Sequence, residues 1–252
     1  MNNVKRHQFI LKKLTDGEYI SVSELCDSLS VSSVTIRKDL QFLENSGLLY
    51  RTHGGATLQN PYQRDRPVFE KEKIHAKEKE RIAQKAAQLI EENDSIIIAS
   101  GTTMQYLAKE IIPKGRLTVV TSALNVSQQL LKHSDVDIIQ LGGSIRHSSN
   151  SVTGQFAEET LHNFFCSKLF LGVDGIDEEF GLTTTNAQEA QLNRKMIAAA
   201  QKVIVLADSS KFGRKSFGKI VDFCKIDVII TDYIPKKYAK LFESLQIEII
   251  IS

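Results

Sequence analysis

The strongest constraint on the fold is an alternation that begins near residue 95. Short runs of isoleucine, valine and leucine predict strands at residues 95–99, 117–121, 136–141, 169–173, 203–207, 228–231 and 247–251. Segments with helical periodicity separate these strands, beginning at Thr102, Ala123 and Phe156 or spanning Glu189–Ala200 and Lys236–Leu245. This alternation predicts βαβ units and an α/β domain with a mostly parallel sheet. Continuous apolar strands are typical of a sheet that helices cover on both faces.

The first 58 residues follow a different pattern. Apolar periodicity predicts three short helices at residues 4–16, 22–29 and 33–45. Two short strands are expected at residues 48–51 and 56–58, joined by a turn whose glycines permit a positive φ. Three helices and a hairpin in so short a segment predict a small α+β domain of the winged helix-turn-helix type.

A joint is expected between these two parts. Residues 59–70 hold two of the four prolines in the chain, which predicts a linker. A charged helix with an apolar stripe is expected to follow over residues 72–91. We therefore expect a winged helix-turn-helix domain at 1–58, a linker at 59–71 and an α/β domain at 72–252.

The composition is that of a folded globular protein, with 42% hydrophobic and 25% charged residues. No apolar run approaches the roughly 18 residues that span a bilayer, and no apolar signal core follows the N-terminus. We therefore expect a soluble, cytoplasmic protein. Cys26, Cys166 and Cys224 lie too far apart for a CxxC pair, and no HExxH motif is present, so neither a metal site nor a disulfide framework is expected.

The helix at 33–45 is the candidate for recognition of DNA, because its polar residues lie off its apolar stripe. The residues that we expect to contact DNA are Ser32, Ser33, Thr35, Arg37, Lys38 and Gln41 from this helix, with Arg51 and His53 from the hairpin. Hydroxyls and helix N-terminal amides suit phosphates, and Arg37 can pair with guanine or with a phosphate. An ordinary three-helix interaction module is the alternative, since residues 1–57 carry seven lysines and arginines against six acidic residues.

A family resemblance favours the DNA-binding interpretation. The run Val31–Leu40, followed by Leu43-Glu44, Gly47-Leu48-Leu49, Arg51 and His53-Gly54-Gly55-Ala56, closely resembles the N-terminal signature of DeoR-family transcriptional repressors. The resemblance implies that Ser33, Thr35, Arg37 and Lys38 face the DNA, and that the wing at residues 51–55 helps to dock it. Family members often carry arginine in place of Lys38, so this chain keeps the charge but loses the planar fork.

The loop Ser100-Gly101-Thr102-Thr103 joins the first strand of the α/β domain to a helix. Its glycine lets the backbone approach an anion, its threonines supply hydroxyls, and the helix N-terminus supplies free amides. Parallel sheets bind ligands at the carboxyl ends of their strands, where this loop lies. It is neither a Walker A loop nor a GxGxxG loop, which favours a simple phosphate over a nucleotide.

Other polar residues follow strands at the same expected edge. They are Thr121, Ser122, Asn125, Gly142, Gly143, Asp174, Gly175, Glu189 and Lys211. Carboxylates and hydroxyls for sugar oxygens, with a lysine for a phosphate, would form a polyol-phosphate pocket, although each loop alone is also ordinary turn chemistry. These segments resemble the DeoR-family sensor domain, which is similar in fold to ribose-5-phosphate isomerase. The resemblance implies a phosphate on residues 100–103, sugar contacts from Asp174 and Lys211, and a pocket shaped by Gly142 and Gly143.

An isomerase is the alternative function. Asp174-Gly175-Ile176-Asp177 looks like the Asp-Gly-Ala-Asp of that enzyme, and isomerisation needs a carboxylate base. The enzyme's lysine and glutamate are missing from residues 182–185 and 193–195, although Glu189 lies nearby. A DNA-packaging protein is a third candidate, but it leaves the polar sheet edge unexplained. We therefore expect no enzyme and no cofactor, but a repressor of sugar uptake or catabolism genes, at least a dimer, which a phosphorylated sugar releases from operator DNA.

Overall fold

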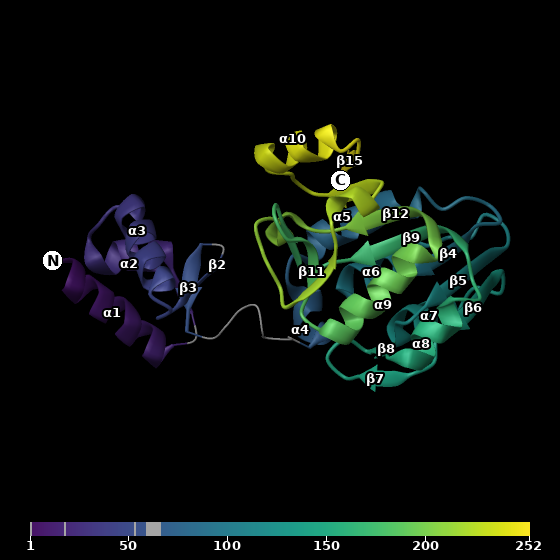
Figure 1. Cartoon of the computed structure of the whole chain (residues 1–252), viewed down its shortest axis with the longest axis horizontal. Helices are drawn as coiled ribbons and strands as arrows, with labels where there is room; N and C mark the ends of the chain where they lie inside the picture. The colour runs from purple at the N-terminus through teal and green to yellow at the C-terminus, as the bar shows by residue number, and fades with distance from the viewer. Residues whose placement is uncertain (1, 18, 53, 59–66) are drawn as a thin grey trace. The chain divides into compact units, whose positions relative to one another are not determined.

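The computed structural model describes residues 2–17, 19–52, 54–58 and 67–252. The chain divides into two compact units, residues 1–64 and 65–252 (Figure 1). Each unit has its own hydrophobic core.

The first unit contains three helices and a small antiparallel sheet. Its elements are α1 (Asn3–Asp16), β1 (Ile20–Ser21), α2 (Val22–Leu29), α3 (Ser33–Asn45), β2 (Tyr50–Thr52) and β3 (Gly55–Thr57). The helices agree with the periodicity of the sequence because each buries an apolar stripe, for example Ile36, Leu40 and Leu43 of α3. Ser21 starts α2 through a capping box with Glu24.

Strand β1 was not expected from the sequence. It has only two residues, too few to show a period, and it pairs with β3 to give the strand order β1-β3-β2. This third strand explains the glycine at position 55: a Cβ there would lie 2.2 Å from the carbonyl oxygen of Ile20. The hairpin that the sequence predicts is therefore part of a three-stranded sheet.

The second unit is built on a seven-stranded parallel sheet of order β15-β14-β12-β9-β4-β5-β6. Its strands are β4 (Ser95–Ile98), β5 (Leu117–Thr121), β6 (Val136–Gln140), β9 (Cys166–Gly172), β12 (Ala200–Leu206), β14 (Val228–Thr231) and β15 (Glu248–Ile251). Its longer helices are α5 (Ala76–Ala87), α6 (Thr102–Glu110), α7 (Leu124–Leu130), α8 (Gln155–Leu161), α9 (Ala187–Ala198) and α10 (Lys236–Ser244). All seven expected strands are present.

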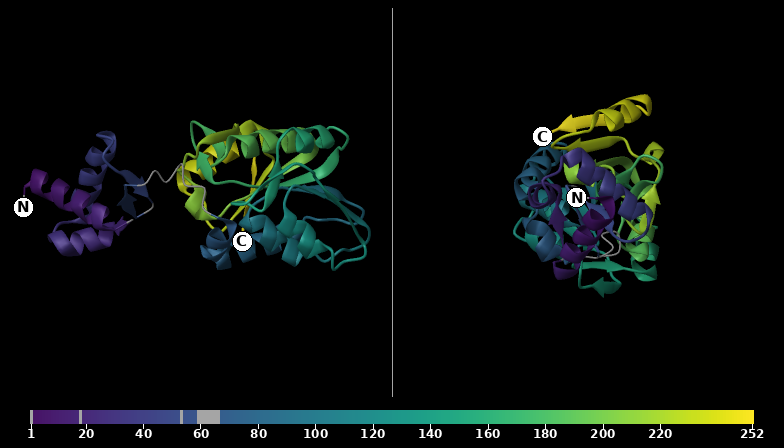
Figure 2. Two further views of the ribbon diagram at one scale, coloured as in Figure 1. Left: turned by 90° about the horizontal axis from the view of Figure 1, so that it is seen from below. Right: turned by 90° about the vertical axis from the view of Figure 1, so that its left-hand side faces the viewer.

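The sheet lies between two layers of helices (Figure 2). Helices α5, α6 and α7 pack on one face, where Ile96 and Ile98 of β4 point. Helices α8, α9 and α10 pack on the other face with Ile97, so successive strand residues enter different cores. This double cover explains why the strands are apolar throughout, as the sequence predicted.

The helix expected at residues 72–91 is two helices, and that expectation was wrong. Helix α4 (Val68–Lys73) begins inside the predicted linker, and α5 follows at Ala76. Between them, Ile74 is extended and His75 adopts a left-handed conformation with φ 53°. The buried Lys79 ammonium stabilises this break between the helices, because it donates hydrogen bonds to the carbonyl oxygens of Lys71 and Ile74 at 2.6 and 2.7 Å.

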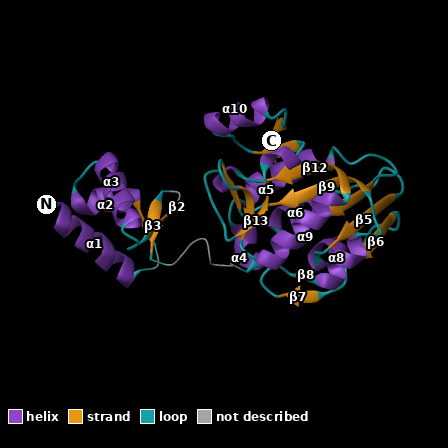
Figure 3. Ribbon diagram, viewed as in Figure 1, coloured by secondary structure: helices purple, strands orange, loops and turns teal. Residues whose placement is uncertain are grey.

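The second unit also contains two small antiparallel sheets, which the sequence did not predict. Strands β7 (Ser144–Arg146) and β8 (Ser151–Thr153) form a hairpin beside α8 (Figure 3). Strands β10 (Gly175–Asp177), β11 (Gly181–Thr184) and β13 (Gly218–Val221) form a second small sheet. A run of three or four residues shows no reliable period, so the sequence could not distinguish these strands from loops.

Two further findings concern membrane-spanning helices and metal sites. Among the described residues, no helix is long and apolar enough to cross a membrane. The described part of the chain also holds no cluster of three or more His, Cys, Asp or Glu side chains placed to bind a metal.

Candidate functional site

Helix α3 presents a polar surface that matches the expected recognition helix. Arg37, Lys38 and Gln41 are exposed, whereas the opposite side of the helix is buried. Ser32 caps the helix by accepting a hydrogen bond from the Thr35 amide at 3.3 Å. The N-terminal half of α3 therefore combines a capped start with two exposed cations, Arg37 and Lys38, which suits the phosphates and base edges of DNA.

The wing is tied to this helix through Arg51. Its backbone amide donates to the carboxylate of Glu44 at 2.9 Å, and its guanidinium donates to the Gln41 side chain. The same guanidinium lies 3.8 Å from Glu44. Arg51 and Gln41 therefore engage each other, and both must leave or share this contact to touch DNA. His53, the other expected wing residue, lies outside the described residues.

Asp39 holds α3 against α1, a role that the sequence analysis missed. The carboxylate accepts hydrogen bonds from Arg6 at 2.7 and 2.9 Å, and a ring nitrogen of His7 lies 3.0 Å away. Burial alone would raise the pKa of Asp39, but the Arg6 and His7 contacts hold that pKa below its usual value. The signal in the sequence was an acidic residue on the apolar side of a helix.

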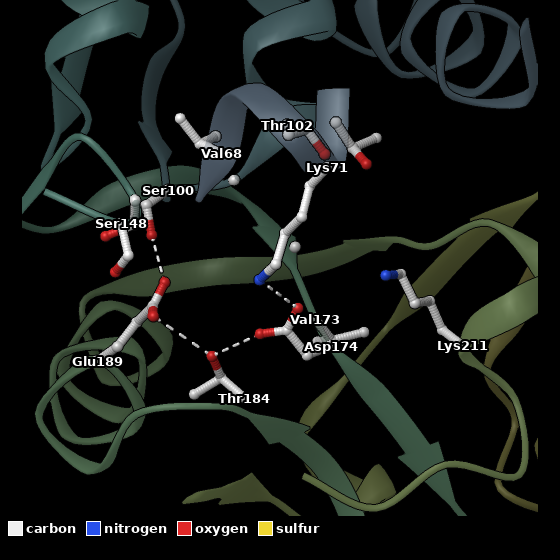
Figure 4. A pocket seen from close by; sticks show the side chains of 14 residues that line it. Val68, Lys71, Ser100, Thr102, Ser148, Val173, Asp174, Thr184, Glu189 and Lys211 are labelled. Carbon is white, nitrogen blue, oxygen red and sulfur yellow. Dashed lines mark hydrogen bonds and ion pairs between the residues drawn. The ribbon is translucent and has the colours of Figure 1, made fainter. Parts of the chain in front are cut away.

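The second unit contains a pocket with about 560 Å³ of empty space, open to solvent. It lies where β4 and β9 end, and helix α4 and the β7–β8 turn complete its wall (Figure 4). Its lining residues are Val68, Lys71, Ser100, Gly101, Thr102, Thr103, Ser148, Ser149, Gly172, Val173, Asp174, Thr184, Glu189 and Lys211. Ligands of parallel sheets bind at this position, beyond the carboxyl ends of the strands.

The loop after β4 gives the pocket its anion-binding feature. Gly101 precedes α6 with φ 127°, a backbone conformation that favours glycine. No side chain among the described residues caps α6, so its first amides stay available to a ligand. Thr102 and Thr103 are buried at the start of this helix. A phosphate at this point would meet free amides, hydroxyls and the positive end of the helix dipole.

A lysine–carboxylate pair stands opposite this loop. The Lys71 ammonium lies 3.1 Å from Oδ1 of Asp174, and Lys211 points toward the same part of the pocket (Figure 4). Thr184 donates to Oδ2 of Asp174 at 3.1 Å. Burial would raise the pKa of Asp174, but the charges of Lys71 and Lys211 and these hydrogen bonds hold that pKa well below its usual range. Asp174 is therefore ionised between two cations.

Glu189 forms a second carboxylate centre in the pocket wall. Ser100 donates to its Oε1 at 2.6 Å, and the Thr184 hydroxyl, whose single proton Asp174 also attracts, lies 3.3 Å from its Oε2. Arg146 of strand β7 donates to Oε2 at 2.5 Å, with both side chains about seven-eighths buried. Glu189, at the start of α9, therefore connects the anion-binding loop at residues 100–103 to the β7–β8 hairpin.

The structure brings some of the expected ligand residues together and leaves others apart. Ser100, Gly101, Thr102, Thr103, Asp174, Glu189 and Lys211 line the same pocket. Thr121, Ser122, Asn125, Gly142, Gly143 and Gly175 do not line it. The β7–β8 hairpin accounts for the loop after β5, because it covers that loop: Leu124 donates to Asn150, and Val152 donates to Ser122.

The separated residues have structural partners. Thr121 donates to the Ile98 carbonyl at 2.7 Å, and Asn125 donates to Gln105 at 2.9 Å. A Cβ at Gly143 would lie 2.7 Å from the Thr153 carbonyl oxygen, and one at Gly175 would lie 2.5 Å from the Arg214 carbonyl oxygen. These two glycines therefore serve close backbone packing where the structure places them.

Several lining residues were missed by the sequence analysis. They are Val68, Lys71, Ser148, Ser149, Gly172, Val173 and Thr184. Val68 and Lys71 fell within the predicted linker, and the two serines occupy the turn of an unpredicted hairpin. A signal in the sequence was the polar run His147-Ser148-Ser149-Asn150, a composition typical of a turn.

Both units match domains of known protein families. Residues 6–61 match the model of the DeoR-like helix-turn-helix domain, and residues 74–233 match that of the DeoR C-terminal sensor domain. Among solved structures, ribose 5-phosphate isomerase A from Methanocaldococcus jannaschii is 14% identical over 56% of each chain, with a TM-score of 0.41. That likeness is too distant to carry an argument about function.

Curated relatives span nearly the whole chain. The chain is 37% identical to the putative aga operon transcriptional repressor of Escherichia coli O157:H7, over 90% of this chain and 86% of the relative. It is 32% identical to the glycerol-3-phosphate regulon repressor of Escherichia coli K12, over 93% of both chains. It is also 32% identical to the transcriptional repressor GlcR of Bacillus subtilis, over 96% and 94%. The chain therefore belongs to the DeoR family of transcriptional regulators, with an N-terminal helix-turn-helix domain and a C-terminal sensor domain, and it is a regulator rather than an isomerase.

Proposed function

We propose that this protein represses genes of sugar uptake or catabolism and that a phosphorylated sugar, bound in the sensor pocket, releases it from operator DNA. The observation that carries this proposal is the uncapped start of α6 facing Lys71 and Lys211 across one pocket. Two cations and a helix N-terminus favour a ligand with more than one negative charge, as a phosphate ester has near neutral pH.

The remaining lining favours hydroxyl groups on the same ligand. Asp174 and Glu189 offer carboxylate oxygens, and Ser148, Ser149 and Thr184 offer hydroxyls. This combination suits a polyol better than an apolar ligand, because a sugar's hydroxyls can replace hydrogen bonds that the pocket would otherwise make to water. The ligand acts as a regulatory effector, and the proposal needs no cofactor.

Helix α4 is the element through which we propose that the pocket signals. Lys71 places its ammonium in the pocket, and the Val68 amide donates to the Ser148 carbonyl oxygen at 2.7 Å. Lys79 holds the other end of the helix, and burial together with the charge of Lys211 lowers the pKa of Lys79 to about 8. A ligand that displaces Lys71 from Asp174 therefore acts on the first helix of the sensor unit. For release, that ligand must bind the DNA-incompetent state more tightly than the DNA-bound state.

The DNA-binding unit sets two further parts of the proposal. A helix-turn-helix domain recognises two half-sites when the protein is at least a dimer, so we propose a homodimer or a larger homo-oligomer. Because the target is operator DNA, we place the protein in the cytoplasm. The printed names of the relatives, which concern the aga operon and the glycerol-3-phosphate regulon, support a sugar-related set of target genes.

A thermal-shift screen tests the ligand directly. Full-length protein is heated with inorganic phosphate, with a panel of triose, pentose and hexose phosphates, and with the matching unphosphorylated sugars. A ligand that binds the folded state raises the melting temperature, and at equal concentration a tighter ligand raises it more. We expect at least one sugar phosphate to stabilise the protein while its unphosphorylated sugar does not. If no phosphorylated compound stabilises it, the proposed ligand class is wrong.

A further inference from the structure

The carboxylate of Glu189 stands next to the place where the proposed phosphate binds. Ser100, the first residue of the anion-binding loop, donates to Oε1 of Glu189 at 2.6 Å. Two anions this close disfavour each other strongly unless a cation neutralises one of them. A phosphate pocket with a glutamate in its wall therefore needs a charge that the loop itself does not supply.

Arg146 supplies that charge from outside the lining. It reaches Oε2 of Glu189 at 2.5 Å from strand β7, and it also donates to the Ser148 hydroxyl at 3.1 Å. The side chains of Arg146 and Glu189 are only 12% and 13% exposed, so water screens their interaction weakly. Arg146 thus fixes the glutamate and one serine of the pocket turn at the same time.

The Ser100 hydroxyl connects this pair to ligand binding. A hydroxyl has a single proton, and in this structure Ser100 donates it to Glu189. A phosphate on the loop competes for the same proton, and Oε1 of Glu189 then becomes available to a hydroxyl donor. A sugar phosphate carries both groups in one molecule, whereas inorganic phosphate brings no sugar hydroxyl to that oxygen.

We propose that Arg146 and Glu189 form a specificity device: Arg146 neutralises Glu189 so that a phosphate can bind beside it, and Glu189 accepts a hydroxyl of the same ligand. This inference rests on the proposed function, because it assumes a phosphate at residues 100–103. It assigns Arg146 as a positioning residue that acts through Glu189, and it identifies the effector as a phosphate ester with a hydroxyl within reach of that carboxylate.

Charge-balance variants test the proposal on the full-length chain, with inorganic phosphate as the probe and calorimetric titration as the readout. Arg146→Gln exposes the phosphate to an unneutralised glutamate and should weaken phosphate binding about tenfold or more, as expected when one partner of a buried charge pair is removed. Glu189→Gln removes the negative charge beside the loop and should tighten phosphate binding severalfold. The double variant removes both charges and should return to within about threefold of the wild type.

Arg116→Gln is the matched control. Arg116 pairs with Asp137 at 2.8 Å, but that pair is exposed and lies outside the pocket lining. Its loss should leave phosphate affinity unchanged. Circular dichroism verifies that each variant is folded, and Glu189→Gln keeps the test decisive if Arg146→Gln does not fold.

Failure of the proposed function and failure of the Arg146–Glu189 proposal give different results. If wild-type protein binds neither inorganic phosphate nor any sugar phosphate, the proposed function fails, and this inference fails with it. If the wild type binds phosphate but Glu189→Gln does not tighten it, or the double variant stays as weak as Arg146→Gln, the pair is merely structural. A second readout concerns the hydroxyl: Glu189→Gln should reduce the preference for a stabilising sugar phosphate over inorganic phosphate, and an unchanged preference overturns that part.

Discussion

Replacement of Thr102 by aspartate places a fixed carboxylate where we expect the phosphate. Thr102 is the first residue of α6, is only 8% exposed and lines the pocket. A carboxylate at a helix N-terminus is stabilised by about 0.3–1 kcal/mol, so the fold should tolerate the change. Against a phosphate dianion at about 6 Å, with an effective dielectric constant of about 20, the same carboxylate is repelled by about 5 kcal/mol. We therefore expect the ligand response to shift by more than about a thousandfold in concentration.

The assay is an operator titration with and without the sugar phosphate that stabilises the wild type. Thr102→Asp should bind operator like the wild type and fail to release it, which gives a repressor that cannot be induced. If the carboxylate instead mimics the phosphate, operator binding is weak even without ligand, and that result also locates the phosphate at this loop. Release at the same ligand concentration as the wild type would contradict the assignment and leave residues 100–103 as a structural turn.

Gln155→Asp provides a control for the local chemistry. Gln155 is the first residue of α8 and follows Gly154, which has φ 101°. No side chain among the described residues caps this helix. This helix shares with α6 a start at a positive-φ glycine, but Gln155 is exposed and does not line the pocket. The control variant should bind operator and release it like the wild type.

Three further predictions address the recognition helix, catalysis and the buried Lys79 of α5, which contacts the end of α4. Arg37→Ala should cost about 1–3 kcal/mol of specific operator binding, and Lys38→Ala should flatten the salt dependence of binding to any sequence; equal operator affinity for the wild type and the double variant would refute the assignment of α3. Purified protein with ribose 5-phosphate should form no ketose phosphate above background in a coupled assay, whereas turnover that disappears in Asp174→Asn or Glu189→Gln would make it an enzyme. The pKa of Lys79 is lowered in the folded state, so the unfolded chain binds more protons between pH 8 and 10.5, and the free energy of unfolding should rise with pH in that window. Denaturant titrations should show a shallower rise for Lys79→Met, and equal slopes would refute the burial of that charge.

Much of the architecture could be predicted because it depends on long apolar patterns. The runs at 96–98 and 228–230 are buried on both faces, which favours unbroken isoleucine and valine. Helix α3 was predicted with the same ends that it has in the structure, because Ser32 caps it and its apolar side repeats. These features are local, and the sequence shows them directly.

The pocket could be predicted only in part, because its wall is made by segments without a local pattern. Ser100 and Asp174 follow apolar strands of the parallel sheet, so their place at the sheet edge was predictable. Lys71 reaches the pocket from a six-residue helix, and Arg146 from a three-residue strand. Their positions follow from tertiary contacts such as the Val68–Ser148 and Arg146–Glu189 bonds, which no periodicity encodes.

In the function that we propose, one ligand links the sensor pocket to DNA binding, and a single titration tests this link. Full-length wild-type protein is titrated onto a fluorescently labelled operator fragment at fixed salt, alone and with the sugar phosphate that stabilises it most in the thermal-shift screen. We predict that this ligand weakens operator affinity at least about tenfold, the range expected for allosteric coupling, while its unphosphorylated sugar has no effect. A sugar phosphate that stabilises the protein but leaves operator affinity unchanged would show that the pocket does not control DNA binding.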